Sequence, residues 1–493
     1  MKLWLTDVME IEFAAAIVCL AADFGKRYYS KWRPYIVGSI ATGSLVISLA
    51  ILLENWGSYS AISTQIQPIV SPFASLYEIN SFTTFVILTA LVIGILVSFY
   101  SWTFLTSEAN AGPFFTILLL LLLSVIGVAS SGDFLTLFLF WECMSISAYG
   151  LVAFYKDSAI SLEASLKYIF LAGVGSLLAL YGISLVYSII GSIQISVIGT
   201  LFSTNSELGV LALLFIILGF GVEAAIFPLH TWLPDVYSAA PTPVSAIVSG
   251  IVTETGIFVL LKIVQPFIGV TGLTVSGSLL NLTPIQDIQL VLAVLAVMTM
   301  LVGNLGGFAQ TNMKRILAYS SIAQMGYMLA ALSTLTMAGL VAVVFNIWNH
   351  GIVKSGFFLE AGMGGKNFED SELANLQGLG QQNKFAGIMF ASSSLAIVGS
   401  PPFGMFWSEL FIVEALVSKS SSLFLVLAAI VVLNIFLSIG YYIKIINKVV
   451  LTPSPDGKSW QKISSGLLLP PMIFIALSLV SGLVPFLLLN HIT

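Results

Sequence analysis

Apolar segments long enough to cross a membrane recur along the whole 493-residue chain, separated by short polar stretches. A membrane-spanning helix needs about 20 predominantly apolar residues, and the pattern predicts fourteen such spans. They lie near residues 8–24, 35–53, 82–103, 113–131, 134–155, 164–190, 208–233, 241–266, 288–309, 315–332, 335–362, 385–417, 422–446 and 466–489. The sequence therefore predicts an all-α polytopic membrane protein.

The composition agrees with a membrane protein and narrows its chemistry. Hydrophobic residues make up 58% of the chain and charged residues 8%, whereas a soluble domain carries about 25% charged residues. No segment has the layout of a removable signal peptide. Cys19 and Cys143 lie in apolar segments, outside any CxxC or Cys/His cluster. With no phosphate-binding glycine loop either, we expect no catalytic residue, metal, cofactor or nucleic-acid site in this chain.

Basic residues are concentrated in alternate loops. By the positive-inside rule, loops rich in lysine and arginine lie in the cytoplasm, which predicts both termini on the outer side of the cell (inner) membrane. The residues assigned to the cytoplasmic side are Lys26, Arg27, Lys31, Arg33, Lys156, Lys167, Lys314, Arg315, Lys366, Lys384, Lys444, Lys448, Lys458 and Lys462. Lys2, Lys262 and Lys419 fall near the opposite side.

Prolines interrupt two of the predicted spans. Pro228 lies in the seventh span, and Pro401 and Pro402 lie in the twelfth. Proline removes a backbone donor and breaks a helix. Two broken spans in corresponding halves of a chain are typical of repeats whose discontinuous helices face a polar cavity.

Ionisable residues lie inside the spans, where their charge is costly and usually functional. His350 and Lys354 are four residues apart, on one helical face. The alternative for each residue is a polar contact between helices. Asp133, Glu360 and Glu414 lie near span ends, where an interfacial role is expected. The residues predicted within the spans are Glu142, Glu223, Glu254, Lys262, His350, Lys354 and Glu409, with His230 just past a break as a relay or a cap.

This row of groups indicates a carrier of protons or small ions. A cavity for a bulky organic substrate would more often gather aromatic and amide residues around one site. We expect Glu142, Glu223, Glu254, Lys354 and Glu409 to form one belt near the middle of the membrane.

Five segments resemble the antiporter-like subunits shared by respiratory complex I, multisubunit cation/proton antiporters and membrane-bound hydrogenases. YSSIAQMGY and ALYGISLVYSIIG are most similar to the complex I subunit nearest the quinone-side membrane module, whereas GSPPFGMFWSEL resembles the hydrogenase-type branch. The chain could therefore belong to either branch. The five segments are FLFWECMSISAYGLV, FPLHTWLPDVYSAAPTPVSA, MKRILAYSSIAQMGY, NHGIVKSGFFLEAG and GSPPFGMFWSEL.

The resemblance implies two five-helix repeats of inverted topology, each carrying half of a proton path. The implied division is 1–112 for helices 1–3, 113–268 for the first repeat, 269–450 for the second and 451–493 for helix 14. Glu142, His350, Lys354 and Glu409 occupy positions of the family's ionisable residues.

Two positions depart from the family pattern. Glu223 stands where the family usually has lysine, and Glu254 stands where several branches have lysine. Two close carboxylates in low dielectric cannot both ionise cheaply, so one should hold a proton or the pair should share a cation. Lys167 and Lys262 could provide positive charge here if they reach inward.

The resemblance implies a proton-translocating, possibly Na⁺-translocating, subunit of a redox-driven assembly of NADH/quinone or hydrogenase type. The chain would have no redox centre of its own. Its partners would be other hydrophobic antiporter-like subunits and a peripheral redox arm. Two alternatives remain: a stand-alone or multisubunit cation/proton antiporter component, and a degenerate structural spacer of the same assembly, which the missing lysine at Glu223 favours.

Overall fold

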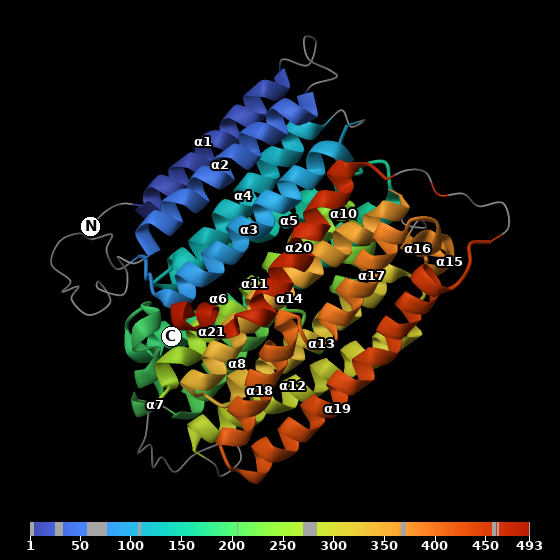
Figure 1. The fold of residues 1–493 in the computed structure, drawn as a ribbon. Helices are drawn as coiled ribbons and strands as arrows, with labels where there is room; N and C mark the ends of the chain where they lie inside the picture. The colour runs from blue at the N-terminus through green and yellow to red at the C-terminus, as the bar shows by residue number, and fades with distance from the viewer. Residues whose placement is uncertain are drawn as a thin grey trace.

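The structure is a computed structural model that describes residues 4–24, 33–56, 76–106, 110–204, 206–269, 283–365, 371–455, 460 and 463–492. Within these ranges the regular structure is helical, with isolated β-bridges at three places. Long helices lie side by side in one bundle (Figure 1). Seven of the basic residues used to predict the topology lie outside the described residues: Lys2, Lys26, Arg27, Lys31, Lys366, Lys458 and Lys462.

The helices follow the predicted apolar segments. In the first half of the chain they are α1 (Trp4–Phe24), α2 (Arg33–Asn55), α3 (Ser81–Phe104), α4 (Ala111–Ser130), α5 (Phe134–Val152), α6 (Ala159–Ile190), α7 (Leu201–Thr204), α8 (Ser206–Gly221), α9 (Trp232–Ala239), α10 (Thr242–Ile247), the π-helical turn η3 (Val248–Val252) and α11 (Thr253–Val264). In the second half they are α12 (Pro284–Ala309), α13 (Met313–Ser333), α14 (Met337–Ala361), α15 (Leu373–Leu376), α16 (Leu379–Gln382), α17 (Lys384–Ile397), α18 (Gly404–Ser418), α19 (Ser422–Ile445), η7 (Ile446–Leu451), α20 (Ser465–Leu483) and α21 (Pro485–Ile492).

Eleven helical stretches among the described residues are long and apolar enough to cross a membrane. The difference from the predicted fourteen has local causes. The first predicted span, α1, carries Asp7, Glu10 and Glu12 within 21 residues. The seventh and twelfth are divided into short pieces, of which α8 has 16 residues and α17 has 14. The chain is therefore an all-α polytopic membrane protein.

Each divided span contains a non-helical stretch of about ten residues or fewer. α8 ends at Gly221 and α9 begins at Trp232, with Pro228 between them. α17 ends at Ile397 and α18 begins at Gly404, with Pro401 and Pro402 between them. Backbone polar groups in such a stretch lack their helical partners, so at membrane depth they must lie inside the protein.

The polar helices lie in the centre of the bundle. Every residue of α11 is buried, and nearly all of α13 and α14 is buried as well. By contrast, apolar side chains of α6 and α19 face outward; Phe170 is 76% exposed and Phe436 is 64% exposed. The surface of the bundle is therefore suited to lipid or to other hydrophobic subunits, and the ionisable residues of α11 and α14 are shielded from it.

Two glycines bring α14 close to η3. A Cβ atom built on Gly351 would lie 2.5 Å from the backbone carbonyl oxygen of Gly250 and 3.1 Å from Ile93.

We predict that Gly351→Ala destabilises the protein by about 1–3 kcal/mol, because the backbone cannot give way without separating the helices. Thermal unfolding of the purified protein in detergent measures this. Gly43→Ala is the control, since a Cβ there meets nothing within 4 Å; equal melting temperatures for the two variants would contradict the prediction.

Candidate ion-translocation site

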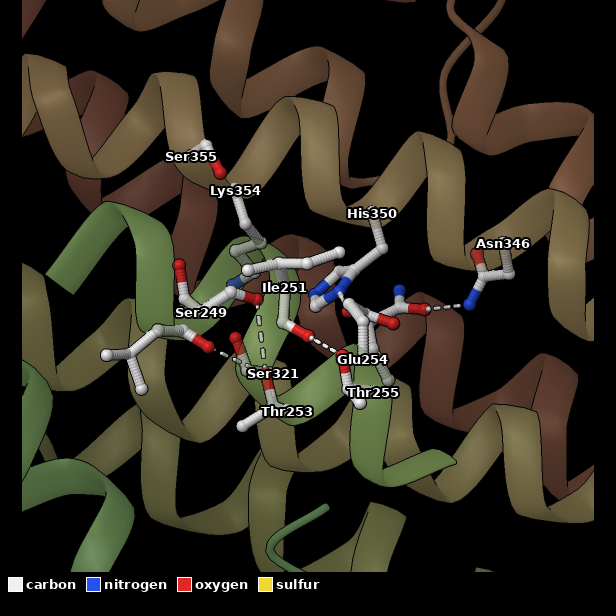
Figure 2. A network of polar contacts seen from close by, with 12 residues as sticks. Ser249, Ile251, Thr253, Glu254, Thr255, Ser321, Asn346, His350, Lys354 and Ser355 are labelled. Atoms are coloured by element: carbon white, nitrogen blue, oxygen red, sulfur yellow. Dashed lines mark hydrogen bonds and ion pairs between the residues drawn. The ribbon is translucent and has the colours of Figure 1, made fainter. Parts of the chain in front are cut away.

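Three buried ionisable side chains meet between α11 and α14. Glu254 Oε1 pairs with His350 Nδ1, and both side chains are fully buried. One turn further along α14, the Lys354 ammonium donates to the Leu317 carbonyl at 2.8 Å and to the Tyr442 hydroxyl at 3.4 Å. Figure 2 shows Glu254, His350 and Lys354 in the space between α14 and the helix formed by η3 and α11.

The local backbone explains why Glu254 faces α14. The π-helical turn η3 ends at Val252, two residues before Glu254. Such turns widen a helix by one residue and are frequent at functional sites. Because Gly250 in this turn contacts the α14 backbone at Gly351, the next turn places Glu254 against His350.

Two atoms of this cluster have no hydrogen-bond partner among the described residues. They are Glu254 Oε2 and His350 Nε2, and both are buried. A buried polar atom without a hydrogen bond destabilises the folded protein by about 1–3 kcal/mol. Glu254 Oε2 and His350 Nε2 would therefore gain a favourable partner by exchanging a proton or by binding water. An imidazole with one nitrogen on a carboxylate and the other open can take a proton on one side and release it on the other.

Glu409 is connected to the same helix by amide side chains. Gln324 on α13 donates to Glu409 Oε1 at 3.1 Å, and Asn346 on α14 donates to Gln324 at 3.4 Å. All three side chains are buried. Since Asn346 lies one turn before His350 on α14, buried polar groups extend from Glu409 on α18 toward Glu254.

Glu223 lies in the break between α8 and α9 and is surrounded by hydroxyl groups. Its carboxylate accepts from Ser145 on α5 at 2.8 Å and from Tyr168 on α6 at 2.5 Å. The Tyr168 ring stacks on Trp232 with 4.0 Å between ring centres. Among the described residues no cationic side chain bonds to Glu223. The Ser145 and Tyr168 hydroxyls are thus the hydrogen-bond partners of this carboxyl group in the described part of the chain.

Glu142 is the least enclosed member of the predicted belt. It is half-buried and accepts a hydrogen bond from Ser176 on α6. The other four, Glu223, Glu254, Lys354 and Glu409, are buried. His230 is half-buried in the break after α8, with its ring 5.8 Å from that of Phe227, and its Nδ1 has no hydrogen-bond partner within the described part of the chain.

Neither lysine suggested as a substitute partner for Glu223 reaches it. Lys167 is half exposed and pairs with Glu163 at 2.9 Å and Asp235 at 2.8 Å. Lys262 is buried and donates to the carbonyls of Ala129 and Ser131. Those carbonyls lie at the C-terminus of α4, which attracts cations. Both lysines therefore hold structural contacts away from Glu223.

Two residues expected at the membrane interface are instead buried. Asp133 is 1% exposed and caps α5 by accepting from the backbone amides of Leu135 and Thr136. Glu360 is fully buried on α14 and accepts from Ser393 at 2.6 Å. Neither side chain is exposed as that of a snorkelling residue would be, because distance from a span end does not reveal which neighbouring helix covers a residue.

Two further buried charges were not singled out from the sequence. Glu12 on α1 accepts from Ser44 and Ser48 on α2, and the four-residue spacing of those serines is the signal that could have found it. Lys314 is buried and donates to the Ala240 carbonyl at 3.0 Å; counting it as a loop residue concealed this.

The chain is similar to membrane subunits of several complexes. A family profile described as "NADH:quinone oxidoreductase/Mrp antiporter, TM" matches residues 131–438. NADH-quinone oxidoreductase subunit N of Desulforamulus reducens is 31% identical over 386 residues, 78% of this chain and 76% of that protein. F(420)H(2) dehydrogenase subunit N of Methanosarcina mazei is 28% identical over 481 residues, 93% of this chain and 92% of that protein.

A solved structure shares the fold over nearly the full length. A chain of the membrane-bound sulfane sulfur reductase, an archaeal respiratory membrane complex, superposes with a TM-score of 0.81 at 28% identity, covering 97% of this chain and 96% of that one. The profile covers more than half of the chain, and the sequence and structural similarities extend across both broken spans. The chain belongs to the NADH:quinone oxidoreductase/Mrp antiporter family of membrane proteins.

Proposed function

We propose that this chain translocates protons as one membrane subunit of a redox-driven respiratory complex. The observation that carries the proposal is the buried cluster of Glu254, His350 and Lys354, which amide side chains extend toward Glu409. The relatives support the setting, since they are named as subunits of dehydrogenases and of a respiratory membrane complex. The partners would be other hydrophobic subunits and a peripheral arm that holds the redox groups.

The cluster favours protons over Na⁺. Hard cations bind through several oxygen ligands, whereas the Glu254 cluster contains an imidazole and an ammonium group within a short distance. These nitrogen groups gain and lose protons and would repel a metal cation when protonated. A proton could pass between Glu254 and His350, while the charge of Lys354 sets how readily either group is protonated.

The same proposal includes the arrangement of the chain in the membrane. α4 to α11 would form the first five-helix repeat, and α12 to η7 would form the second, inverted one. The divided spans α8/α9 and α17/α18 would then occupy equivalent positions as the seventh and twelfth of fourteen spans, with both termini on the outer side. Glu223 and Glu409 lie beside these two breaks, which supports a matched role for the two carboxyl groups.

This function predicts that the protein is purified as part of an assembly. Mild detergent extraction followed by native mass spectrometry should find this chain bound to other hydrophobic subunits and to a peripheral redox arm. The physical reason is that the described residues contain apolar outward faces on α5, α6, α12 and α19 and no cluster that could hold a metal. A single chain that exchanges cations for protons unaided in vesicles would instead establish the antiporter alternative.

A further inference from the structure

Glu360 is a buried carboxyl group that the pathway described above does not use. It lies six residues after Lys354 on α14, and its side chain is fully buried. Ser393 on α17 donates to Oε1 at 2.6 Å. The second oxygen, Oε2, is buried and has no hydrogen-bond partner among the described residues.

Among the described residues, no cationic side chain bonds to Glu360. On α13, which packs against α14, Lys314 is buried but donates to the Ala240 carbonyl. α20 contains no titratable side chain, and on α17 the one such residue is Lys384, which is exposed. From α3, Tyr100 donates to the Leu359 carbonyl at 3.1 Å. An ionised carboxylate left unpaired in such a place is penalised by several kcal/mol, so Glu360 is suited to hold a proton.

An aromatic residue lies between Glu360 and Lys354 on α14. The two Cα atoms are about 9 Å apart along α14, given a rise of 1.5 Å per residue. Phe357 lies between them in the sequence; its ring is 6.3 Å from that of Tyr442 and 6.2 Å from that of Phe390. The Phe357 ring therefore packs near an aromatic neighbour of each polar group: Tyr442, which bonds to Lys354, and Phe390, which lies one turn before Ser393 on α17.

We propose that Glu360 is a proton-binding site that exchanges protons with Lys354 from the C-terminal end of α14, with Ser393 orienting its carboxyl group and Phe357 closing the route between transfers. The proposal rests on the proposed function. The inference adds a residue that would connect the cluster of Glu254, His350 and Lys354 to one side of the membrane. A metal cation fits poorly here because, among the described residues, Ser393 is the one hydrogen-bonding oxygen at Glu360, whereas Ca²⁺, for example, takes 6–8 oxygen ligands.

The first test is spectroscopic and needs no activity. Infrared spectra of the purified wild-type assembly and of the Glu360→Gln assembly are recorded at neutral pH and subtracted. The wild-type spectrum should contain the C=O band of one protonated carboxylic acid, and the variant spectrum should lack it. Glu414→Gln is the matched control, since Glu414 is an exposed carboxyl group on α18. The glutamine variant keeps the size of the side chain, so folding should be retained. Wild-type and variant spectra without this difference would overturn the proposal.

The second test is proton pumping by the assembly in sealed vesicles. Glu360→Gln should lower this subunit's contribution to pumping by about 100-fold, the lower end of the range for loss of a proton-transfer group, while electron transfer continues. Glu360→Asp and Ser393→Ala should have intermediate effects, and Glu414→Gln none. Unchanged pumping in Glu360→Gln together with lost pumping in Lys354→Met would overturn this inference alone. Unchanged pumping in both variants would overturn the proposed function itself.

Discussion

Replacing Lys354 with methionine is expected to reduce this subunit's contribution to proton pumping at least tenfold, while electron transfer continues. Lys354 is fully buried, and its ammonium group is held by the Leu317 carbonyl and the Tyr442 hydroxyl, with no direct ion pair among the described residues. It is the cation of the Glu254 cluster, and proton-transfer groups typically contribute about 10²–10⁴-fold to a rate. Methionine keeps the length and removes the charge. The measurement is vesicle acidification recorded beside the redox rate.

Lys354→Arg separates a need for charge from a need for proton exchange. Arginine remains protonated at any physiological pH, so it would restore pumping if a fixed positive charge were sufficient. We expect it to fail, because the proposed proton exchange between Glu360 and Lys354 requires the ammonium group to release a proton. Lys156→Met is the matched control, since Lys156 is exposed between α5 and α6. A methionine variant of Lys354 that pumps like the control would contradict a role for this residue.

The second large effect is expected at Glu223. Glu223→Gln should strongly reduce pumping with little change in electron transfer, because the amide cannot take up or release a proton. The surrounding groups provide the reason: Ser145 and Tyr168 both donate to the carboxyl group, and no described lysine replaces the charge that the family usually has here. Pumping and redox rates in reconstituted vesicles test this.

Replacing Glu223 with lysine, the residue that the family resemblance implies at this position, is the complementary test to Glu223→Gln. Glu223→Lys should be tolerated better than Glu223→Leu, because the Ser145 and Tyr168 hydroxyls can accept hydrogen bonds as well as donate them. In addition, half-buried Glu142 on α5 would regain an opposite charge. Full pumping in Glu223→Gln would mean that protons bypass this break. The first half of the chain would then serve as a structural spacer.

The sequence was sufficient to predict the class of protein and its family. Apolar runs and the motif segments report these features directly. The partners of each charge depend on helix packing, so they could not be predicted. Glu254 and His350 are 96 residues apart, and their contact depends on the π-helical turn and the Gly250–Gly351 approach. Similarly, Lys262 bonds to the end of α4 rather than to a carboxylate, a contact with backbone groups that leaves no trace in side-chain patterns.

The same limit applies to Glu360. Its position near the end of a span does not reveal that α17 covers it and that Ser393 bonds to it. A short polar residue such as Ser393 is common in membrane helices, so the pair has no distinctive spacing. Glu223 shows the opposite case, in which a departure from the family pattern was evident from the sequence. Its hydroxyl partners became apparent only in the structure.

The most direct test of proton translocation by this chain is the number of protons moved per electron in an assembly that carries both Glu223→Gln and Lys354→Met. The two substitutions affect separate halves of the chain, so both halves of the proposed proton path are interrupted. The account predicts that the ratio falls below the wild-type value by the whole contribution of this subunit, with the redox rate and subunit composition preserved. A ratio equal to that of the wild-type assembly would contradict it.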